Sequence, residues 1–375
     1  MTILDLLDED LLSKDNIKAI CDNIKEIIYP KNLPKFFTLL LYLDIYLITF
    51  YNPIKKDDSS IHMAINIDLK YFYPSLVFLT SLMDNRASST FYNIHILIGD
   101  SITKMHYKNI YNLIKKKGNN HVKVKFHKMG NQFQGATHGR YISIADYYRI
   151  ALPSLLPTVD KILYIDTDVI NFKDLSEMYN IEINDDIYFM GTLDNIGLMN
   201  ELRHIRKLTK YMNAGILIMN LKGIRKYGIE QKIRKYISKH FLNHHDQTAI
   251  NAVCYKNLGI LSIKYATFVY KSFEDLVEFN KKQNKIHRYK NDELIKAYYE
   301  PTLLHYVGWV KPWEKRYSNS KEEYWWYYAK KSGYFEEIIN NYQFSRERVN
   351  QLLEKIPKNG GLLRKFEKSI VDENI

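Results

Sequence analysis

Two aspartates directly follow a short apolar segment near the middle of this 375-residue chain. The run Lys161–Ile165 has the composition of a buried strand, and Asp166 and Asp168 come next, two positions apart. Where a chain leaves a sheet, this spacing lets both carboxylates reach one point, and paired hard oxygens suit Mg²⁺ or Mn²⁺ carrying a diphosphate. Aspartates that only form a turn are the alternative explanation.

A second polar segment, residues 305–313, supplies groups that complement the two carboxylates. The imidazole of His305 could complete a metal shell, Gly308 would let the backbone approach a phosphate, and Lys311 could neutralise phosphate charge. Each residue alone could be a core histidine, a turn glycine or a surface lysine. Their combination within nine residues favours a binding site.

Two further segments place polar residues next to predicted elements. Asn213, Ala214 and Gly215 form a small-residue turn before an apolar run, where the amide could bind a hydroxyl and the small residues leave room for a ligand. Asp246 and Gln247 stand at the start of a predicted helix, although Asp246 could simply cap that helix.

Short apolar runs alternate with helical stretches through the central part of the chain. We expect strands at 63–67, 91–98, 122–126, 161–165, 187–191 and 215–219, and helices that include 71–83, 142–152 and 231–241. Strands separated by helices predict a mostly parallel, doubly wound sheet in an α/β fold. Ligands of such sheets bind beyond the carboxyl ends of the strands, where the two aspartates would lie.

The flanks of this α/β domain are predicted to be helical. We expect an N-terminal extension over 1–60, the α/β domain over 61–315 and an aromatic and basic C-terminal extension over 316–375. The apolar run 36–51 is shorter than the roughly 20 residues of a membrane-spanning helix, so a buried or interfacial helix is expected there.

The formal charge of +12 is concentrated in the stretch 203–239, which would attract polyanions or form a solvated surface. No recognised nucleic-acid motif occurs, so no nucleic-acid partner is expected. Cys21 and Cys254 have no zinc, redox or disulfide spacing, and the acidic first ten residues do not resemble a secretory signal. We therefore expect a cytoplasmic protein, free or peripherally attached to the cytoplasmic membrane face.

The four polar segments, in this order, resemble glycosyltransferase family 8, which includes bacterial lipopolysaccharide galactosyl- and glucosyltransferases and, more distantly, glycogenin. The resemblance covers residues 61–315. It implies a GT-A fold, with a Rossmann-like, mainly parallel sheet flanked by helices. It also implies a UDP-hexose donor, Mn²⁺ or Mg²⁺, a glycan or glycolipid acceptor, and transfer with retention of the anomeric configuration.

The family's site residues are carried over position by position. Its metal ligands fall on Asp166, Asp168 and His305. Its remaining donor-binding positions fall on Asp68, Tyr71, Arg149, Thr167, Asn213, Ala214, Gly215, Gly308 and Lys311. The positions nearest the reacting carbon fall on Asp194, Asp246 and Gln247.

The chain departs from the family near the start of the domain. The family usually shows Ala-x-Asp-Asp-Asn-Tyr there, whereas this chain reads Asn-Ile-Asp-Leu-Lys-Tyr over residues 66–71. Asp68 and Tyr71 are kept, which predicts that the uracil and ribose end is still held. The missing asparagine weakens the expectation that UDP is the only nucleotide accepted.

Retention needs either a carboxylate nucleophile or attack by the acceptor from the face that the leaving group occupies. The resemblance places Gln247, a poor nucleophile, near the anomeric carbon, which favours front-face attack with a β-phosphate oxygen as the base. An alternative function is an inactive transferase-like module that binds glycans or membranes. The aromatic cluster 324–328 and the basic-apolar segment 362–370 predict attachment to an anionic membrane, unless the aromatic residues belong to the core.

Overall fold

The computed structural model describes residues 60–356, apart from 119, 134–142, 196–201, 203–204 and 206–207. All of these residues belong to one compact unit, Asp58–Ile375. The predicted N-terminal extension up to residue 59, the run 36–51, the segment 362–370 and part of the basic stretch 203–239 lie outside the described residues.

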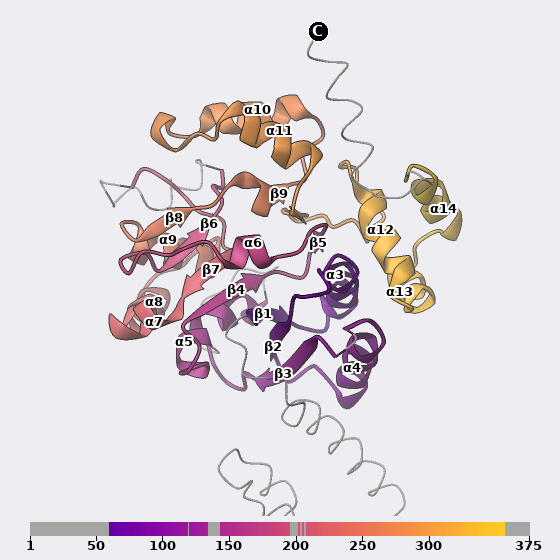
Figure 1. Cartoon of the computed structure of the whole chain (residues 1–375), viewed down its shortest axis with the longest axis horizontal. Helices are drawn as coiled ribbons and strands as arrows, with labels where there is room; N and C mark the ends of the chain where they lie inside the picture. The colour runs from indigo at the N-terminus through magenta and orange to yellow at the C-terminus, as the bar shows by residue number, and fades with distance from the viewer. Residues whose placement is uncertain are drawn as a thin grey trace, which may run out of the picture. The chain divides into compact units, whose positions relative to one another are not determined.

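A seven-stranded sheet forms the centre of this unit, with the order β3-β2-β1-β4-β7-β6-β8 (Figure 1). Its strands are β1 (Ile61–Ile67), β2 (Tyr92–Ile98), β3 (Val122–Lys128), β4 (Lys161–Ile165), β6 (Phe189–Gly191), β7 (Ile216–Asn220) and β8 (Leu258–Ile260). Strands β1 to β4 pair in parallel, and β6 pairs in parallel with β8. Only β7 pairs in the opposite direction, with both β4 and β6. The predicted mixed, mainly parallel sheet is therefore confirmed.

A small second sheet continues from the carboxyl end of β4. It consists of β5 (Val169–Asn171), β10 (Leu303–His305) and β9 (Thr267–Phe268), with β10 in the middle. Because β10 is antiparallel to β5, His305 lies opposite Val169. This pairing brings a residue from late in the chain next to the segment that follows β4.

Helices cover both faces of the large sheet. One face packs against α3 (Phe72–Asp84) and α4 (Lys104–Gly118). The other face packs against the 3₁₀ helix η4 (Ile144–Ala151), α5 (Leu152–Leu155), α7 (Leu221–Lys226), α8 (Ile229–Ile237) and α9 (His245–Cys254). The remaining helices are α6 (Ser176–Tyr179), η6 (Ile263–Tyr265), α10 (Phe273–Lys282), η7 (Lys285–His287), α11 (Asn291–Tyr299), α12 (Glu322–Lys331), α13 (Phe335–Tyr342) and α14 (Arg346–Glu354).

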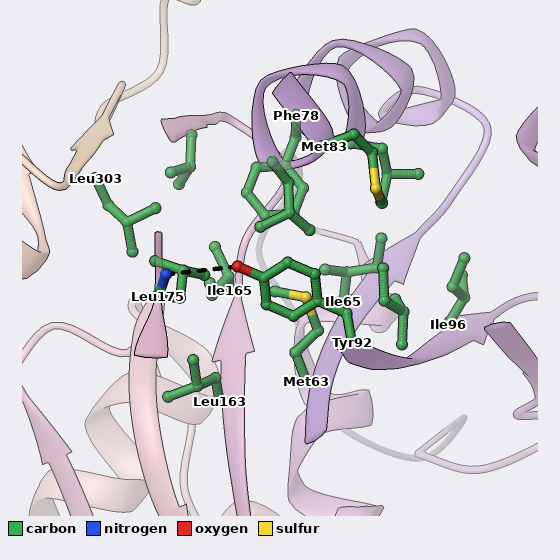
Figure 2. Packing of buried hydrophobic residues seen from close by; sticks show 14 of the residues in the cluster. Met63, Ile65, Phe78, Met83, Tyr92, Ile96, Leu163, Ile165, Leu175 and Leu303 are labelled. Atoms are coloured by element: carbon green, nitrogen blue, oxygen red, sulfur yellow. Dashed lines mark hydrogen bonds between the residues drawn. The ribbon is translucent and has the colours of Figure 1, made fainter. Parts of the chain in front are cut away.

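The alternation of side chains along the strands decides which helices each strand residue meets. Met63 and Ile65 of β1 point toward Phe78 of α3 and pack with Tyr92 of β2 in one apolar cluster (Figure 2). The Tyr92 hydroxyl accepts a hydrogen bond of 3.4 Å from the Leu175 backbone, so its polar end is satisfied inside the core. This packing fixes the carboxyl ends of β1 and β4 at one edge of the sheet.

The aromatic cluster of the C-terminal helices belongs to the core. Trp325 and Trp326 are fully buried, and the ring of Trp325 lies 5.1 Å from that of Trp313. The indole of Trp326 donates to the Pro312 carbonyl at 3.1 Å. The prediction that the residues of 324–328 meet a membrane is therefore wrong for the buried rings of this cluster. Within the described residues, no helix combines the length and apolarity needed to cross a bilayer.

Candidate active site

The carboxyl ends of β1 and β4 border an open pocket. It is lined by Asn66, Asp68, Tyr71, Ala145, Asp146, Asp166, Thr167 and Asp168. Asp166 is held in place because its backbone N–H donates to the Gly215 carbonyl at 2.7 Å, immediately before β7. The pocket therefore lies where a mostly parallel sheet is expected to bind its ligand.

Asp166 and Asp168 line this pocket, and His305 lies beside them. One potential ligand atom from each residue lies within 4.8 Å of the others. His305 Nε2 is 3.2 Å from Asp168 Oδ1, as the pairing of β10 with β5 requires. The structure thus brings together the three residues that the sequence predicts as metal ligands.

Three observations indicate that this cluster fits a hard divalent cation. Two carboxylates and one imidazole are suitable ligands for Mn²⁺ or Mg²⁺. His305 Nδ1 is buried without a hydrogen-bond partner. A Cβ added to Gly215 would lie 2.3 Å from His305 Cε1 and 2.8 Å from Asp166 Oδ2, so the glycine keeps the space beside these groups open.

Lys311 lies on Asp168. Its Nζ donates to Asp168 Oδ2 at 2.5 Å and to the Tyr306 carbonyl at 2.7 Å, and the side chain is buried. We expected this lysine to face a phosphate, but the structure directs it to a carboxylate beside the predicted metal position. Gly308, in the same loop, has a φ of +94°, which L-residues rarely adopt, and Trp309 next to it is 64% exposed.

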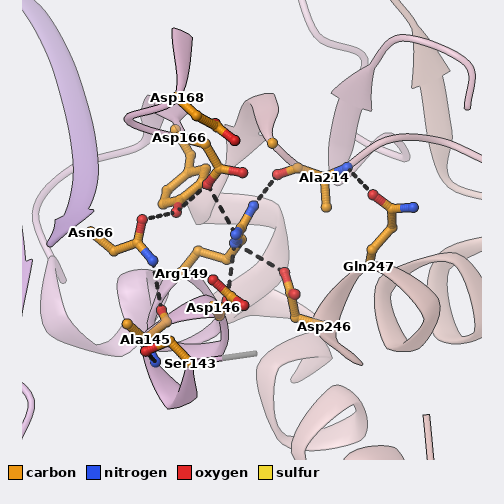
Figure 3. A network of polar contacts seen from close by, with 12 residues as sticks. Asn66, Ser143, Ala145, Asp146, Arg149, Asp166, Asp168, Ala214, Asp246 and Gln247 are labelled. Atoms are coloured by element: carbon orange, nitrogen blue, oxygen red, sulfur yellow. Dashed lines mark hydrogen bonds and ion pairs between the residues drawn. The ribbon is translucent and has the colours of Figure 1, made fainter. Parts of the chain in front are cut away.

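Arg149 occupies the centre of a second polar network (Figure 3). Its Nη2 donates to Asp166 Oδ1 at 3.1 Å, its Nε lies 3.0 Å from Asp246 Oδ2, and its Nη1 donates to the Ala214 carbonyl. The guanidinium also lies over the ring of Tyr164, 4.1 Å from its centre. Arg149 therefore links the segments that follow β4, precede β7 and begin α9.

Burial changes the acidity of these carboxyl groups in different directions. It raises the pKa of Asp166, and Arg149 offsets only part of that effect. Burial would also raise the pKa of Asp168. There, however, Lys311 and other positive neighbours outweigh burial, and the pKa of Asp168 is lowered. Burial raises the pKa of Asp246 to about 6 in spite of its ion pair with Arg149. Three carboxyl groups, those of Asp168 and Asp246 buried and that of Asp166 partly buried, thus face two cationic side chains, and a bound divalent cation would relieve the excess negative charge.

The predicted sugar end of the site is a connected group of amides around Asp194. Asp194 Oδ2 accepts from Asn213 Nδ2 at 2.8 Å and from Gln247 Nε2 at 3.1 Å. Gln247 Oε1 in turn accepts from the Ala214 backbone at 2.9 Å. The side-chain oxygen of Asn213 accepts from the Gly215 backbone at 2.9 Å. The turn before β7, the start of α9 and the loop after β6 are therefore joined in one network.

Most of the predicted site residues lie in these groups. Asp68 and Tyr71 line the pocket, and the Tyr71 backbone donates to Asp68 Oδ1 at 2.9 Å. Gly308 is the exception, because it neither lines the pocket nor takes part in the polar contacts described above.

Sequence reasoning missed three residues that shape the site: Asn66, Asp146 and Tyr164. The Tyr164 hydroxyl lies 2.8 Å from Asp166 Oδ1 and 2.6 Å from Asn66 Oδ1. Asn66 was detectable as a polar residue between two isoleucines at the end of a mostly apolar strand. The roles of Asp146 and Tyr164 depend on which segments meet in the fold, so their local sequence gave no signal.

Comparison with known proteins identifies the family to which this chain belongs. A model of glycosyl transferase family 8 matches residues 62–316, more than half of the chain, so the chain belongs to this family. General stress protein A of Bacillus subtilis (strain 168) is 27% identical over 199 residues, which make up 51% of this chain and 65% of that protein. A lipopolysaccharide 1,2-glucosyltransferase of Escherichia coli is 22% identical over 275 residues, or 70% of this chain and 76% of that protein. The match thus spans less than two thirds of the first of these relatives.

Solved structures support the GT-A fold. The galactosyltransferase LgtC, determined in complex with donor and acceptor sugar analogues, superimposes with a TM-score of 0.60 at 18% sequence identity. The match covers 72% of this chain and 96% of that chain. At this identity the likeness concerns the fold alone.

Proposed function

We propose that the protein is a metal-dependent, retaining hexosyltransferase that moves glucose or galactose from a UDP-sugar to a glycan or glycolipid acceptor. The acceptor we propose is a lipopolysaccharide or another cell-surface polysaccharide. The observation that carries the proposal is the cluster of Asp166, Asp168 and His305, two of which line a pocket beyond the carboxyl ends of β1 and β4. The family match supports the transferase class.

The chain's own residues would prepare this cluster for a nucleotide diphosphate. Lys311 and Arg149 each hold one of the two aspartates in a fixed orientation, so the carboxylates need no rearrangement to bind a cation. A bound Mn²⁺ or Mg²⁺ would stabilise the negative charge of the leaving diphosphate. Asp68 and Tyr71, which also line the pocket, would hold the uridine.

The network around Asp194 would bind the donor hexose. Both ends of the Gln247 amide are already engaged, one with Asp194 and one with the Ala214 backbone, so its orientation is set. An amide is a poor nucleophile, and the nearby carboxylate of Asp246 is paired with Arg149. These contacts favour front-face attack by the acceptor hydroxyl, with the β-phosphate oxygen accepting its proton.

An exposed indole supports a sugar acceptor. Trp309 is 64% exposed and lies in the loop between His305 and Lys311. Because consecutive Cα atoms are about 3.8 Å apart, its Cα lies within about 8 Å of that of Lys311, whose side chain binds Asp168. A broad apolar ring at this place offers a surface for the apolar face of a sugar.

The test is a screen of UDP-glucose and UDP-galactose for hydrolysis and transfer, with Mn²⁺, with Mg²⁺ and after chelation by EDTA. We expect activity with one of these donors that EDTA abolishes and the cation restores. Proton NMR of the first product from an α-linked donor should show an α-linkage. A chain that binds glycans but turns over neither donor would support the alternative of an inactive module.

A further inference from the structure

A ten-residue segment that runs from the last two residues of α10 to the start of α11, which we name the basic tip, carries an unusual charge pattern. The basic tip is residues 281–290, Lys-Lys-Gln-Asn-Lys-Ile-His-Arg-Tyr-Lys, with five lysine and arginine residues and no acidic residue. All five of these cationic residues are exposed: Lys281, Lys282, Lys285, Arg288 and Lys290. The site described above uses none of them.

An apolar side chain lies in the middle of these cations. Ile286, in the short helix η7, is 74% exposed, the largest exposed fraction among the exposed large apolar side chains of the described residues. A single exposed apolar residue is ordinary on a protein surface. An isoleucine surrounded by lysines and an arginine, however, is the composition of a segment that inserts at a bilayer interface.

The basic tip is firmly attached to the protein beside the predicted sugar end of the site. Asn280 and Tyr289 close its base through two hydrogen bonds of 3.0 and 2.9 Å. The Gln283 amide donates to the Asp194 carbonyl at 3.0 Å, and the Tyr289 hydroxyl accepts from the Leu193 backbone at 3.0 Å. Any surface that holds the basic tip would therefore also orient the segment that carries Asp194.

Another lysine-rich surface with an exposed apolar residue, on helix α4, has structural explanations. Helix α4 carries Met105, 64% exposed, and ends with three lysines at 115–117. Cations in the last turn of a helix offset its dipole, and Lys117 is paired with Asp84 at 2.7 Å. In Figure 1, α4 lies at the opposite end of the view from α10 and α11. Helix α4 therefore provides a matched control surface.

We propose that the basic tip docks the protein on an anionic lipid bilayer, with Ile286 at the level of the acyl boundary and the lysines among the headgroups. The exposed isoleucine favours a bilayer over nucleic acid or an acidic protein, because only the bilayer offers an apolar layer directly beneath a negatively charged one. Contacts within the protein reduce the positive charge that the basic tip offers to a bilayer. Glu278 pairs with Lys282 at 3.4 Å, and Arg288 donates to the carbonyls of Lys281 and Gln283. Attachment is therefore reversible. If the proposed transferase function holds, docking would present the sugar end of the site to a lipid-linked acceptor.

The experiment measures sedimentation of the full chain with phosphatidylcholine vesicles, with and without phosphatidylglycerol, in EDTA and without any nucleotide sugar. We expect binding only to the vesicles that contain phosphatidylglycerol, with release at high salt. Replacing Lys281, Lys282 and Lys285 together with glutamine should weaken binding about 100-fold, since each cation near an anionic surface contributes about a factor of five. Ile286→Asp should weaken it about tenfold or more.

The matched controls change the same residue types on α4. Lys108, Lys115 and Lys116 replaced together with glutamine remove the same charge, and Met105→Asp alters the exposed apolar residue there. Both control variants should bind as the wild type does. Wild-type protein that ignores anionic vesicles, or an equal loss in the tip and α4 variants, would overturn the proposal. Donor hydrolysis, measured separately, reports on the transferase function, so the two can fail independently.

Discussion

The carboxylate of Asp168 is bound from both ends of one loop. His305 begins the loop and lies 3.2 Å from one oxygen, and Lys311 ends it and donates to the other oxygen at 2.5 Å. All three side chains are buried. Asp168 therefore both offers a ligand atom and holds the loop that supplies the histidine, whereas Asp166 relies on Arg149 and Tyr164.

This difference predicts unequal effects of two amide substitutions. Asp168→Asn should lower the free energy of unfolding by about 3–5 kcal/mol, because Lys311 would keep a buried charge without its carboxylate. Asp166→Asn should cost less, because Arg149 retains Asp246 as an ion-pair partner. Urea denaturation in EDTA measures both values, and equal losses would contradict the distinction.

The same two variants test the cation site. Wild-type protein should gain about 2.7 kcal/mol of stability when Mn²⁺ is present at 100 times its dissociation constant. Asp166→Asn and Asp168→Asn should both lose this gain, and both should lower turnover by orders of magnitude, because a neutral amide is a poor ligand for a hard divalent ion. Thermal unfolding with and without Mn²⁺ is the readout. A full Mn²⁺ response in either variant would remove that residue from the metal site.

Gly215→Ala should damage the site while leaving the fold intact. The new Cβ would lie 2.3 Å from His305 Cε1 and 2.8 Å from Asp166 Oδ2, so one of these side chains must move. We expect a weaker Mn²⁺ response and at least a tenfold lower turnover, with circular dichroism unchanged. Gly130→Ala is a control for the substitution type, because nothing lies within 4 Å of its Cβ position, although its φ of +50° adds some local strain. Normal activity of Gly215→Ala would show that the space beside the glycine is not used.

At the scale of single residues, the sequence predicted which residues belong to the site better than it predicted which side chains they contact. The spacing of Asp166 and Asp168 after an apolar run was sufficient to locate the carboxylates, and the polar segment 305–313 indicated His305 before the resemblance supported it. The contact of Lys311 with Asp168 could not be predicted, because it depends on the pairing of β10 with β5 across more than 130 intervening residues.

At the scale of helices and strands, the main feature is a row of histidines on three neighbouring strands. His95 of β2 lies between His62 of β1 and His127 of β3, with ring nitrogens 3.4 and 3.0 Å apart. Burial, aided by the two other histidines, lowers the pKa of His95 to about 3. The row therefore remains favourable only while His95 is neutral.

This row predicts a loss of stability in acid. Between pH 6.5 and 3 the unfolded chain binds a proton at His95 and the folded chain does not, so the free energy of unfolding rises with pH in this window. At pH 4 the cost relative to pH 7 should be roughly 3 kcal/mol. His95→Gln should remove most of that difference in urea denaturation at the two pH values. His240→Gln, at an exposed position, should not, and an unchanged pH dependence in His95→Gln would refute the assignment.

Element prediction succeeded where an apolar run was long enough to be seen. The strand at 161–165 matches the predicted bounds, and the helix predicted at 71–83 is found at 72–84. The two-residue strand β9 and the three-residue strands β5 and β10 were not predicted, because they exist through pairing with one another rather than through a local pattern. The reversed direction of β7 also had no signal in its own sequence, since it follows from how the chain returns to β4.

At the scale of the whole molecule, the C-terminal helices and the transferase-like domain share one apolar core. Val77 of α3, Ile170 of β5 and Trp313 pack in the same buried cluster as Trp325 and Trp326 of α12. Asn85, which ends α3, also donates to the Tyr328 hydroxyl at 2.7 Å. The family match ends at residue 316, but the apolar core does not end there.

A pair of truncations tests whether the boundary at 315 separates two folding units. A chain that ends at residue 316 keeps every predicted site residue, yet it loses two buried tryptophans, each of which covers roughly 150–250 Å² of apolar surface. Loss of one such side chain costs about 3–5 kcal/mol, and losing both would consume most of the 5–15 kcal/mol by which domains are stable. The chain that ends at 316 should therefore be insoluble or lack near-ultraviolet circular dichroism. A chain that ends at 356 keeps all the described helices and should unfold cooperatively, as the full chain does, in urea. A stable, cooperatively folded chain of 316 residues would show instead that the helices after residue 316 are an appendage to a domain complete without them.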